Sequence, residues 1–167
     1  MEYLIVSDSH GRPDRIEEML QRQISPPVAL FFAGDGLRDL EQVEMGNITL
    51  YAVSGNCDWF ARSALSDTEL LGNIEGHTFF LTHGHSYGVK GGIGVLIARA
   101  AQVGANIVLF GHTHQPLLQV IPKGTPIGNI TLRRPMYLFN PGSIGNDGSF
   151  GTLTLRGDCV LFSHGQL

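Results

Sequence analysis

Two histidines follow a short apolar run in the second half of the chain. Residues 107–110 read Ile-Val-Leu-Phe, and Gly111, His112, Thr113 and His114 come next. Such a run is typical of a strand covered on both faces, and glycine permits a sharply turned backbone at its end. In extended backbone both imidazoles would point to one side, whereas a turn would direct them toward two neighbouring ions. Because neutral histidine is a common metal ligand, the segment predicts a metal site, although a pair of polar loop histidines is the simpler alternative.

Four earlier apolar runs also end in side chains that can bind a metal or move a proton. In chain order these side chains are Asp8, His10, Asp35, Asn56, His83 and His85. A single Gly-Asp-Gly, such as the one around Asp35, is usually only a turn. A series of strand ends that all carry such groups is different, because the carboxyl ends of parallel strands face one crevice. We therefore expect these side chains to converge.

The elements that position them follow from the apolar pattern. The expected strands of the first part cover residues 3–7, 28–33, 48–54, 65–74, 78–82 and 106–110. One helix is expected to open at residues 12–14 and to end before the Ser-Pro-Pro at 25–27, with a core stripe of Ile16, Met19, Leu20 and Ile24. A second is expected to close near Gly104, with a stripe of Ile93, Leu96, Ile97 and Ala100.

After residue 116 the pattern becomes antiparallel. The expected strands cover residues 117–121, 127–132, 136–139, 151–155 and 159–163. The polar loop 140–145 suits an ordinary turn and a contribution to the site equally well. His77 is expected in an exposed turn, and His164 is expected to have no role. The whole predicts an α/β fold with two sheets packed together and helices outside, built as a single domain over residues 1–167.

Composition excludes several classes of protein. The chain has 167 residues and a formal net charge of −4, so nucleic acid is not expected as a partner. No apolar run approaches the roughly 20 residues that span a bilayer, and the first residues do not resemble a signal peptide. Cys57 and Cys159 form neither a Cys-x-x-Cys pair nor a disulfide framework. These features predict a cytoplasmic protein without a membrane partner, and its antiparallel edge would suit a homo-oligomer.

The well-placed groups are too many for one ion. Seven are counted as candidate metal ligands, with His85 in reserve: Asp8, His10, Asp35, Asn56, His83, His112 and His114. A tetrahedral zinc needs three or four ligands and often uses thiolates, which are absent from this set. Mixed oxygen and nitrogen ligands in this number fit two ions about 3.5–4 Å apart, the arrangement used for phosphoryl transfer. Asp35, on the central strand of the first three, is the expected bridge.

These motifs resemble those of a known family. The order Asp8-x-His10, Gly34-Asp35, Gly55-Asn56, His83-Gly84-His85 and Gly111-His112-Thr113-His114 resembles the calcineurin-like metallophosphoesterase superfamily. The short chain resembles its small prokaryotic phosphodiesterase branch. The resemblance implies a four-layer α/β/β/α sandwich of two mixed sheets. It also implies one metal held by Asp8, His10, Asp35 and His114, and another held by Asp35, Asn56, His83 and His112.

The function implied by this resemblance is that of a dimetal-dependent phosphodiesterase. A metal-bridging hydroxide would attack the phosphorus of a small-molecule phosphodiester in line with the leaving group. The resemblance and the ligand types together favour two divalent cations, with Mn²⁺ first and Ni²⁺, Fe²⁺, Zn²⁺ or Mg²⁺ as alternatives.

One position departs from the pattern of many family members. Where they have a histidine after the motif asparagine, this chain has Cys57, followed by Asp58. A thiol donates a proton less readily than an imidazolium, so we expect phosphodiesters with good leaving groups to be preferred over alkyl phosphomonoesters. Asp58 is expected to orient a metal-bound water or an imidazole. The expected catalytic residues are Asn56, Cys57, Asp58 and His85, and the expected phosphate-binding residues are Arg12, Asn56 and His85.

Two other functions remain as alternatives on the same fold. One is a non-catalytic scaffold that binds a protein partner, as the retromer subunit of this fold does. The filled ligand positions argue against it. The other is a nuclease like the larger repair enzymes of the superfamily, which carry additional domains and usually the histidine that is missing at position 57.

Overall fold

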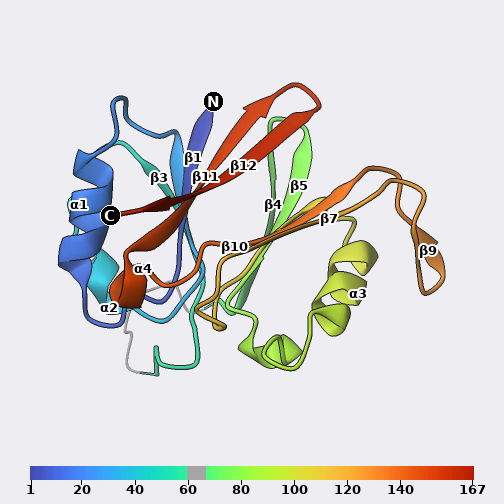
Figure 1. The fold of residues 1–167 in the computed structure, drawn as a ribbon, viewed down its shortest axis with the longest axis horizontal. Coiled ribbons are helices and arrows are strands. Elements are labelled where there is room, and N and C mark those ends of the chain that lie inside the picture. The colour runs from blue at the N-terminus through green and yellow to red at the C-terminus, as the bar shows by residue number, and fades with distance from the viewer. Residues whose placement is uncertain (60–66) are drawn as a thin grey trace.

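Two five-stranded sheets pack face to face in the computed structural model, which describes residues 1–59 and 67–167 (Figure 1). The first sheet has the order β12 (Cys159–Gln166), β11 (Ser149–Arg156), β1 (Glu2–Val6), β2 (Ala29–Phe32) and β3 (Thr49–Ala52). The second has the order β4 (Glu69–Ile74), β5 (His77–Thr82), β6 (Ile107–Leu109), β10 (Met136–Asn140) and β7 (Leu117–Ile121). A two-stranded hairpin, β8 (Pro126–Ile127) and β9 (Ile130–Thr131), stands apart.

Both sheets are mixed, with parallel strands in the middle. Strands β1, β2 and β3 run parallel because α1 (Pro13–Gln21) and α2 (Leu37–Leu40) supply the crossovers between them. In the second sheet β5, β6 and β10 are parallel, and the first crossover contains η1 (His85–Tyr87) and α3 (Gly94–Gln102). The hairpins β4–β5 and β11–β12 close the sheets with antiparallel pairs. All of the parallel strands therefore point their carboxyl ends the same way within their sheet.

Three apolar layers separate four layers of structure. Between the sheets lies an aromatic core in which the rings of Phe31 and Phe79 meet edge to face at 5.0 Å and Tyr51 stacks on Phe31. A second core lies under α3, and a third lies under α1, α2 and α4 (Ile144–Asp147), on the outer faces of the two sheets (Figure 1). Burying each large side chain contributes about 1.5–3 kcal/mol. The expected α/β/β/α sandwich is confirmed.

Three expectations about elements were wrong. Helix α1 ends at Gln21 and Arg22 caps it, so Ile24 lies beyond the helix and is fully exposed instead of packed in the core. Residues 127–132 do not form one strand, because Gly128 at φ 59° turns the chain back into the β8–β9 hairpin. The strand expected from residue 65 begins at Glu69, and residues 65 and 66 lie outside the described part of the chain.

Two histidines also differ from expectation. His77 is 3% exposed instead of lying on the surface, and its Nε2 meets the carbonyl of Gly157 at 3.0 Å. The ring of His164 stacks on Phe139 at 4.4 Å, and its Nε2 meets the Asn140 carbonyl at 2.8 Å. Both contacts join segments far apart in the sequence, so the local pattern does not reveal them.

The helices carry no membrane signal. Among the described residues, none forms part of a helix long and apolar enough to cross a bilayer.

The two sheets approach each other closely at a glycine. A Cβ atom on Gly151 of β11 would lie 2.2 Å from Cε1 of Phe139 on β10. Phe139 has no room to retreat, since Phe162 stacks on it at 4.7 Å.

We predict that Gly151→Ala lowers the free energy of unfolding by about 1–3 kcal/mol, the usual cost of overpacking a core. Urea denaturation with circular dichroism measures it. Gly94→Ala, at the exposed start of α3 where an added Cβ meets nothing within 4 Å, is the matched control and should change stability by less than about 0.5 kcal/mol. Equal stability of the two variants would contradict the close approach.

Candidate metal centre

The polar strand ends meet where the two sheets adjoin. Asp8 and Asp35 follow β1 and β2 of the first sheet, and His83 and His112 follow β5 and β6 of the second. Two hydrogen bonds join the sheets at this place. The amide of His112 donates to Oδ2 of Asp8 at 3.1 Å, and Nδ1 of His83 lies 2.7 Å from the carbonyl of Ala33. The junction is therefore built by the candidate ligands themselves.

One group of candidate metal ligands comprises Asp8, His10 and His114. Oδ1 of Asp8 lies 3.0 Å from Nε2 of His114 and 3.6 Å from Nε2 of His10. The two Nε2 atoms are 3.3 Å apart. Two imidazole nitrogens this close to each other and to a carboxylate need a proton or a cation between them, so this group could hold a cation.

A second group comprises Asp35, His83 and His112. Oδ2 of Asp35 lies 3.3 Å from Nε2 of His83, and the rings of His83 and His112 are 5.0 Å apart. Since Nδ1 of His83 donates to the Ala33 carbonyl, Nε2 carries the lone pair when the ring is neutral and donates to Asp35 when the ring is protonated. Asp35 also belongs to a third group, with His10 and Cys57, so it lies between the other two groups.

Several buried atoms at the centre have no hydrogen-bond partner. They are Oδ1 of Asp8, Oδ1 of Asn56, Nε2 of His83 and Nδ1 of His85. An unpaired buried polar atom costs about 1–3 kcal/mol, and more when it is charged. Unpaired atoms of ligand type fit bound cations, and the mixed oxygen and nitrogen set suits borderline or hard divalent ions.

The backbone at these residues is unusual. Among the described residues other than glycine, six have positive φ, and five of them are candidate ligands: Asp8, His10, Asp35, His112 and His114. Left-handed backbone costs a non-glycine residue about 1–2 kcal/mol and persists where the surroundings enforce it. The chain therefore turns sharply after each strand and directs these side chains inward.

Charges within the centre shift its pKa values. Burial acts to raise the pKa of the Asp35 carboxyl, but hydrogen bonds from His83 and from the Cys57 amide outweigh burial and lower it strongly. Burial acts to lower the pKa of His83, and the bond to Asp35 and the nearby Asp8 charge raise it instead. Burial and the neighbouring His83 lower the pKa values of His85 and His112, so both are poised as neutral bases.

Asp58 acts on the backbone, whereas the sequence suggested that it would orient a water or an imidazole. Its carboxylate accepts hydrogen bonds of 2.8–2.9 Å from four main-chain amides, those of Asp35, Gly36, Leu37 and Gly55. The same loops approach so closely that a Cβ on Gly55 would lie 2.0 Å from Oδ1 of Asp35. Asp58 therefore fixes the turn that carries Asp35.

Cys57 is exposed and lies beside Asp35 and His10. Burial, a hydrogen bond to Asp35 and nearby carboxylates raise the pKa of its thiol to about 11. The thiol therefore keeps its proton near neutral pH and releases it even less readily than an ordinary cysteine.

Arg12 and His85 lie at the margin of the centre. The guanidinium of Arg12 donates two hydrogen bonds, of 2.7 and 2.9 Å, to the carboxylate of Asp14, and both side chains are exposed. The His85 ring lies 5.4 Å from that of His83 and 6.1 Å from that of His112, with Nδ1 buried and unpaired. Of the two, His85 is the better placed to meet a ligand.

Sequence reasoning missed Asn146 and Lys90 near the centre, and it left open whether the loop 140–145, which contains Ser143, contributes. The side-chain amide of Asn146 meets Nδ1 of His114 at 3.0 Å, and Ser143 donates to the carbonyl of Asp8 at 2.8 Å. The loop after β10 thus supports the first group of ligands. Lys90 lies near enough to His112 to lower its pKa and lines a hollow of about 400 Å³ with Thr113. The one sequence signal for Asn146 was the Ser-x-x-Asn cap that opens α4.

Comparison of sequences finds relatives over nearly the whole chain. A family model described as the calcineurin-like phosphoesterase superfamily domain matches residues 1–165. The chain is 29% identical over 165 residues to the probable metallophosphoesterase YsnB of Bacillus subtilis, a match that covers 96% of this chain and 88% of that protein.

Comparison of structures finds the same fold at lower sequence identity. A predicted phosphoesterase from Streptococcus pneumoniae superposes with a TM-score of 0.75 at 23% identity, over 98% of this chain and 87% of its own. Vps29 from Entamoeba histolytica, in complex with Zn²⁺, superposes with a TM-score of 0.72 at 18% identity, over 98% of each chain. An archaeal phosphodiesterase superposes with a TM-score of 0.70 at 19% identity, over 98% of this chain and 99% of its own. These likenesses bear on the fold alone.

We predict that Asp58→Asn weakens binding of Mn²⁺ by about tenfold or more and lowers the unfolding temperature. The side chain of Asn has one oxygen, which accepts only weaker, charge-free bonds, and its NH₂ group cannot accept from the amides that the second carboxylate oxygen now serves. Isothermal titration calorimetry and thermal denaturation measure the two effects. Asp158→Asn, in the exposed turn between β11 and β12, is the control and should change neither. Unchanged metal affinity in Asp58→Asn would show that the turn holds its form without the carboxylate.

We also predict that metal affinity falls as pH falls. His83 must offer an unprotonated Nε2, and its raised pKa means that protons compete above the ordinary histidine value of 6.5. The apparent affinity should drop by up to about tenfold per pH unit between about pH 8 and pH 6. Calorimetry in buffers of different ionisation enthalpy should detect protons released on binding. Binding that is independent of both pH and buffer would contradict this.

Proposed function

Because the chain belongs to the calcineurin-like phosphoesterase superfamily, we propose that it is a dimetal-dependent phosphodiesterase acting on a small-molecule phosphodiester. The observation that carries the proposal is the presence of candidate metal ligands, some with buried and unpaired atoms, at the junction of the sheets. The archaeal phosphodiesterase of the same fold is consistent with it.

In this proposal two divalent ions share Asp35. One is held by Asp8, His10, Asp35 and His114, and the other by Asp35, Asn56, His83 and His112. The grouping of Asp8 with His10 and His114, and of Asp35 with His83 and His112, supports this division. Mn²⁺ is the proposed ion, because carboxylate, amide and imidazole ligands suit it and no thiolate belongs to the set.

The ions would lower the pKa of an attacking water and neutralise charge on the phosphoryl oxygens. The residues of the chain contribute orientation and proton transfer. Asn56, with its Oδ1 free and its Nδ2 directed at Cys57, lies where it can hold a metal and meet the phosphate. His85 presents an unpaired Nδ1 and lies beside His83 and His112 of the second group. It is the proposed contact to the phosphate and the proposed donor of a proton to the leaving group.

Diesters are favoured over monoesters by two features of the site. The thiol of Cys57, with a pKa of about 11, is a weak acid for an alkoxide leaving group. Arg12 is already engaged by Asp14, so its charge is partly neutralised and less is left for the second negative charge of a monoester. Such a site suits a phosphodiester, which carries one negative charge, when its leaving group departs as a stable anion. Arg12 keeps only an auxiliary phosphate-binding role in this proposal.

A non-catalytic scaffold is the second candidate, favoured by the structural likeness to Vps29. A scaffold would bind a protein partner and would need no substrate. The Vps29 structure in question holds Zn²⁺, so metal binding alone does not separate the two candidates, and turnover must be measured.

We predict that the Mn²⁺-loaded protein hydrolyses bis(p-nitrophenyl) phosphate with a higher kcat/KM than p-nitrophenyl phosphate, by about tenfold or more, because Asp14 already engages Arg12 and leaves less positive charge for the second negative charge of the monoester. Release of p-nitrophenol reports both rates. Cys57→His should raise kcat/KM for substrates with alkyl leaving groups and so narrow the difference in kcat/KM between good and poor leaving groups. Faster hydrolysis of the monoester would contradict the assignment as a diesterase.

We predict that His85→Ala lowers kcat for the diester by about 10²–10⁴-fold, the usual contribution of a positioned acid or base. Its metal content, measured by plasma emission spectroscopy, should stay at the wild-type value. Ser86→Ala, at the neighbouring exposed position in η1, is the control. Loss of metal together with activity would instead make His85 a ligand.

A further inference from the structure

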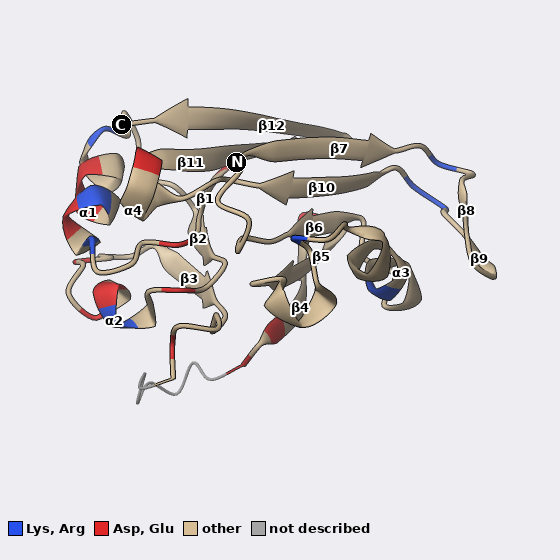
Figure 2. Ribbon diagram, turned by 60° about the horizontal axis from the view of Figure 1, so that its bottom comes forward, with Lys and Arg blue, Asp and Glu red and all other residues tan. Residues whose placement is uncertain are grey.

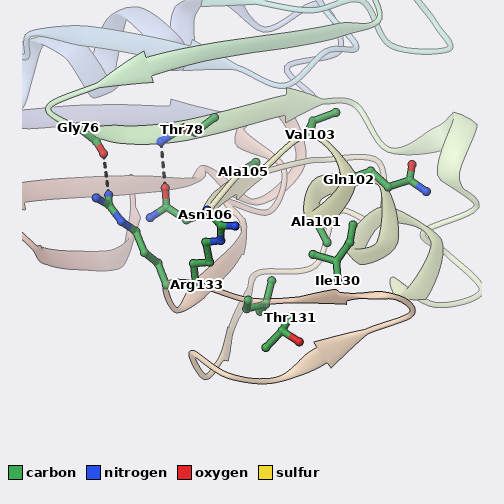
Figure 3. A pocket seen from close by; sticks show the side chains of 13 residues that line it. Gly76, Thr78, Ala101, Gln102, Val103, Ala105, Asn106, Ile130, Thr131 and Arg133 are labelled. Carbon is green, nitrogen blue, oxygen red and sulfur yellow. Dashed lines mark hydrogen bonds between the residues drawn. The ribbon is translucent and has the colours of Figure 1, made fainter.

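A hollow of about 670 Å³ lies at the end of the second sheet that faces away from the metal centre (Figure 3). Its walls are the last turn of α3, the starts of β5 and β6, strand β9, and residues 132–134, which lead from β9 to β10. The volume falls in the range of about 300–1,000 Å³ that is typical of small-molecule sites. Strand β5 leads from Thr78 in the hollow to His83 at the centre, a distance of roughly 17 Å at the rise of an extended strand.

The charge of this hollow is opposite to that of the protein. Arg133 and Arg134 line it, and its lining contains no Asp or Glu, in a chain of formal net charge −4. Figure 2 shows Lys and Arg, and no acidic residue, along the segments that connect the β8–β9 hairpin to β7 and β10. Two arginines in a lining that contains no acid make the local potential positive, so an anion would be favourable here.

The two arginines have different surroundings. Nη1 of Arg134 donates to the carbonyl of Gly76 at 2.8 Å, which anchors that side chain to the turn before β5. Arg133 has no hydrogen bond or ion pair with any residue that the structure describes, and Figure 3 shows its side chain extending toward Asn106. A guanidinium presents donors in a planar fork that matches a phosphate or a carboxylate.

The floor of the hollow is polar and rigid. Asn106 is 8% exposed, its Oδ1 accepts from the amide of Thr78 at 2.9 Å, and its Nδ2 meets Nδ1 of His77 at 2.9 Å. The bond from Thr78 fixes the orientation of the side-chain amide, because an N–H requires the oxygen. The bond to His77 uses one of the two N–H groups on Nδ2, which leaves the second available to a ligand beside Arg133.

The remaining wall is apolar. Ala101 and Leu132 are buried, and Ile130 is half-buried beside them. We propose that the hollow is a second binding site, for a small organic anion whose phosphate or carboxylate group is held by Arg133 and Asn106. The apolar part of that anion packs against Ala101, Ile130 and Leu132.

A purely structural role for Arg133 is the competing account. A cation near the C-terminal end of α3 stabilises the helix dipole, by typically 0.3–1 kcal/mol. In that case removal of the guanidinium would lower stability and leave ligand binding unaffected. Measurement of both quantities on one variant separates the two accounts.

The test uses nuclear magnetic resonance of ¹⁵N-labelled, Mg²⁺-loaded protein titrated with phenylphosphonate, phenylacetate and, as a neutral probe, benzyl alcohol. The phosphonate has no ester bond to cleave, so the result does not depend on the proposed activity. We expect a saturable shift of the amide signals of Thr78, Gly104 and Asn106 with one or both anions, and a much weaker response to benzyl alcohol. The anion that binds more tightly identifies the group that the site takes.

Arg133→Gln should weaken this binding by about tenfold or more, the loss of one charge-assisted pair of hydrogen bonds. Arg156→Gln, at the exposed end of β11, is the matched control and should bind as the wild type does. Three results would overturn the proposal. These are the absence of saturable shifts with both anions, equal binding by Arg133→Gln, and an equal response to benzyl alcohol.

Discussion

The structure depends on carboxylates and imidazoles that crowd together, partly buried, where its two sheets meet. Oδ1 of Asp8 and Nε2 of His83 have no hydrogen-bond partner, and Nε2 of His10 and of His114 face each other at 3.3 Å. Lone pairs and negative charge at this density are unstable in a low-dielectric setting unless cations stand between them. A metal ion would therefore be both the reactive group of the site and a link between the sheets, since Asp35 comes from one sheet and His83 from the other.

The rest of the fold can be understood as support for that arrangement. The parallel strands bring the loops that carry the candidate ligands to one edge of each sheet, and left-handed backbone directs their side chains inward. Asp58 accepts hydrogen bonds from four main-chain amides and so holds the turn at Asp35. The aromatic layer between the sheets fixes their distance, so the ligands from the two sheets stay in register. The opposite end of the second sheet lies away from the candidate ligands. It carries positive charge, and a rigid polar floor built on Asn106 and His77.

Much of this could be predicted from the sequence, because the ligands directly follow apolar runs. Asp8, Asp35, His83 and His112 each stand at a strand end, and parallel topology then places them together. The expectations that were wrong or missing depend on contacts between distant segments. His77 is buried through Gly157, 80 residues away, and Asn146 reaches His114 from a separate loop. Ile24 was misplaced because the helical stripe continues in the sequence beyond the point where α1 ends.

The most direct test of this account is hydrolysis of bis(p-nitrophenyl) phosphate by metal-stripped protein, before and after addition of Mn²⁺, with Asp35→Asn measured alongside. Asp35 is the one residue that both ions would share, so its substitution should abolish the activity that Mn²⁺ restores to the wild type. Asp158→Asn should behave as the wild type. If folded wild-type protein binds two ions and yet hydrolyses nothing with Mn²⁺, Ni²⁺, Fe²⁺, Zn²⁺ or Mg²⁺, the phosphodiesterase account is wrong and a scaffold that binds a protein partner takes its place.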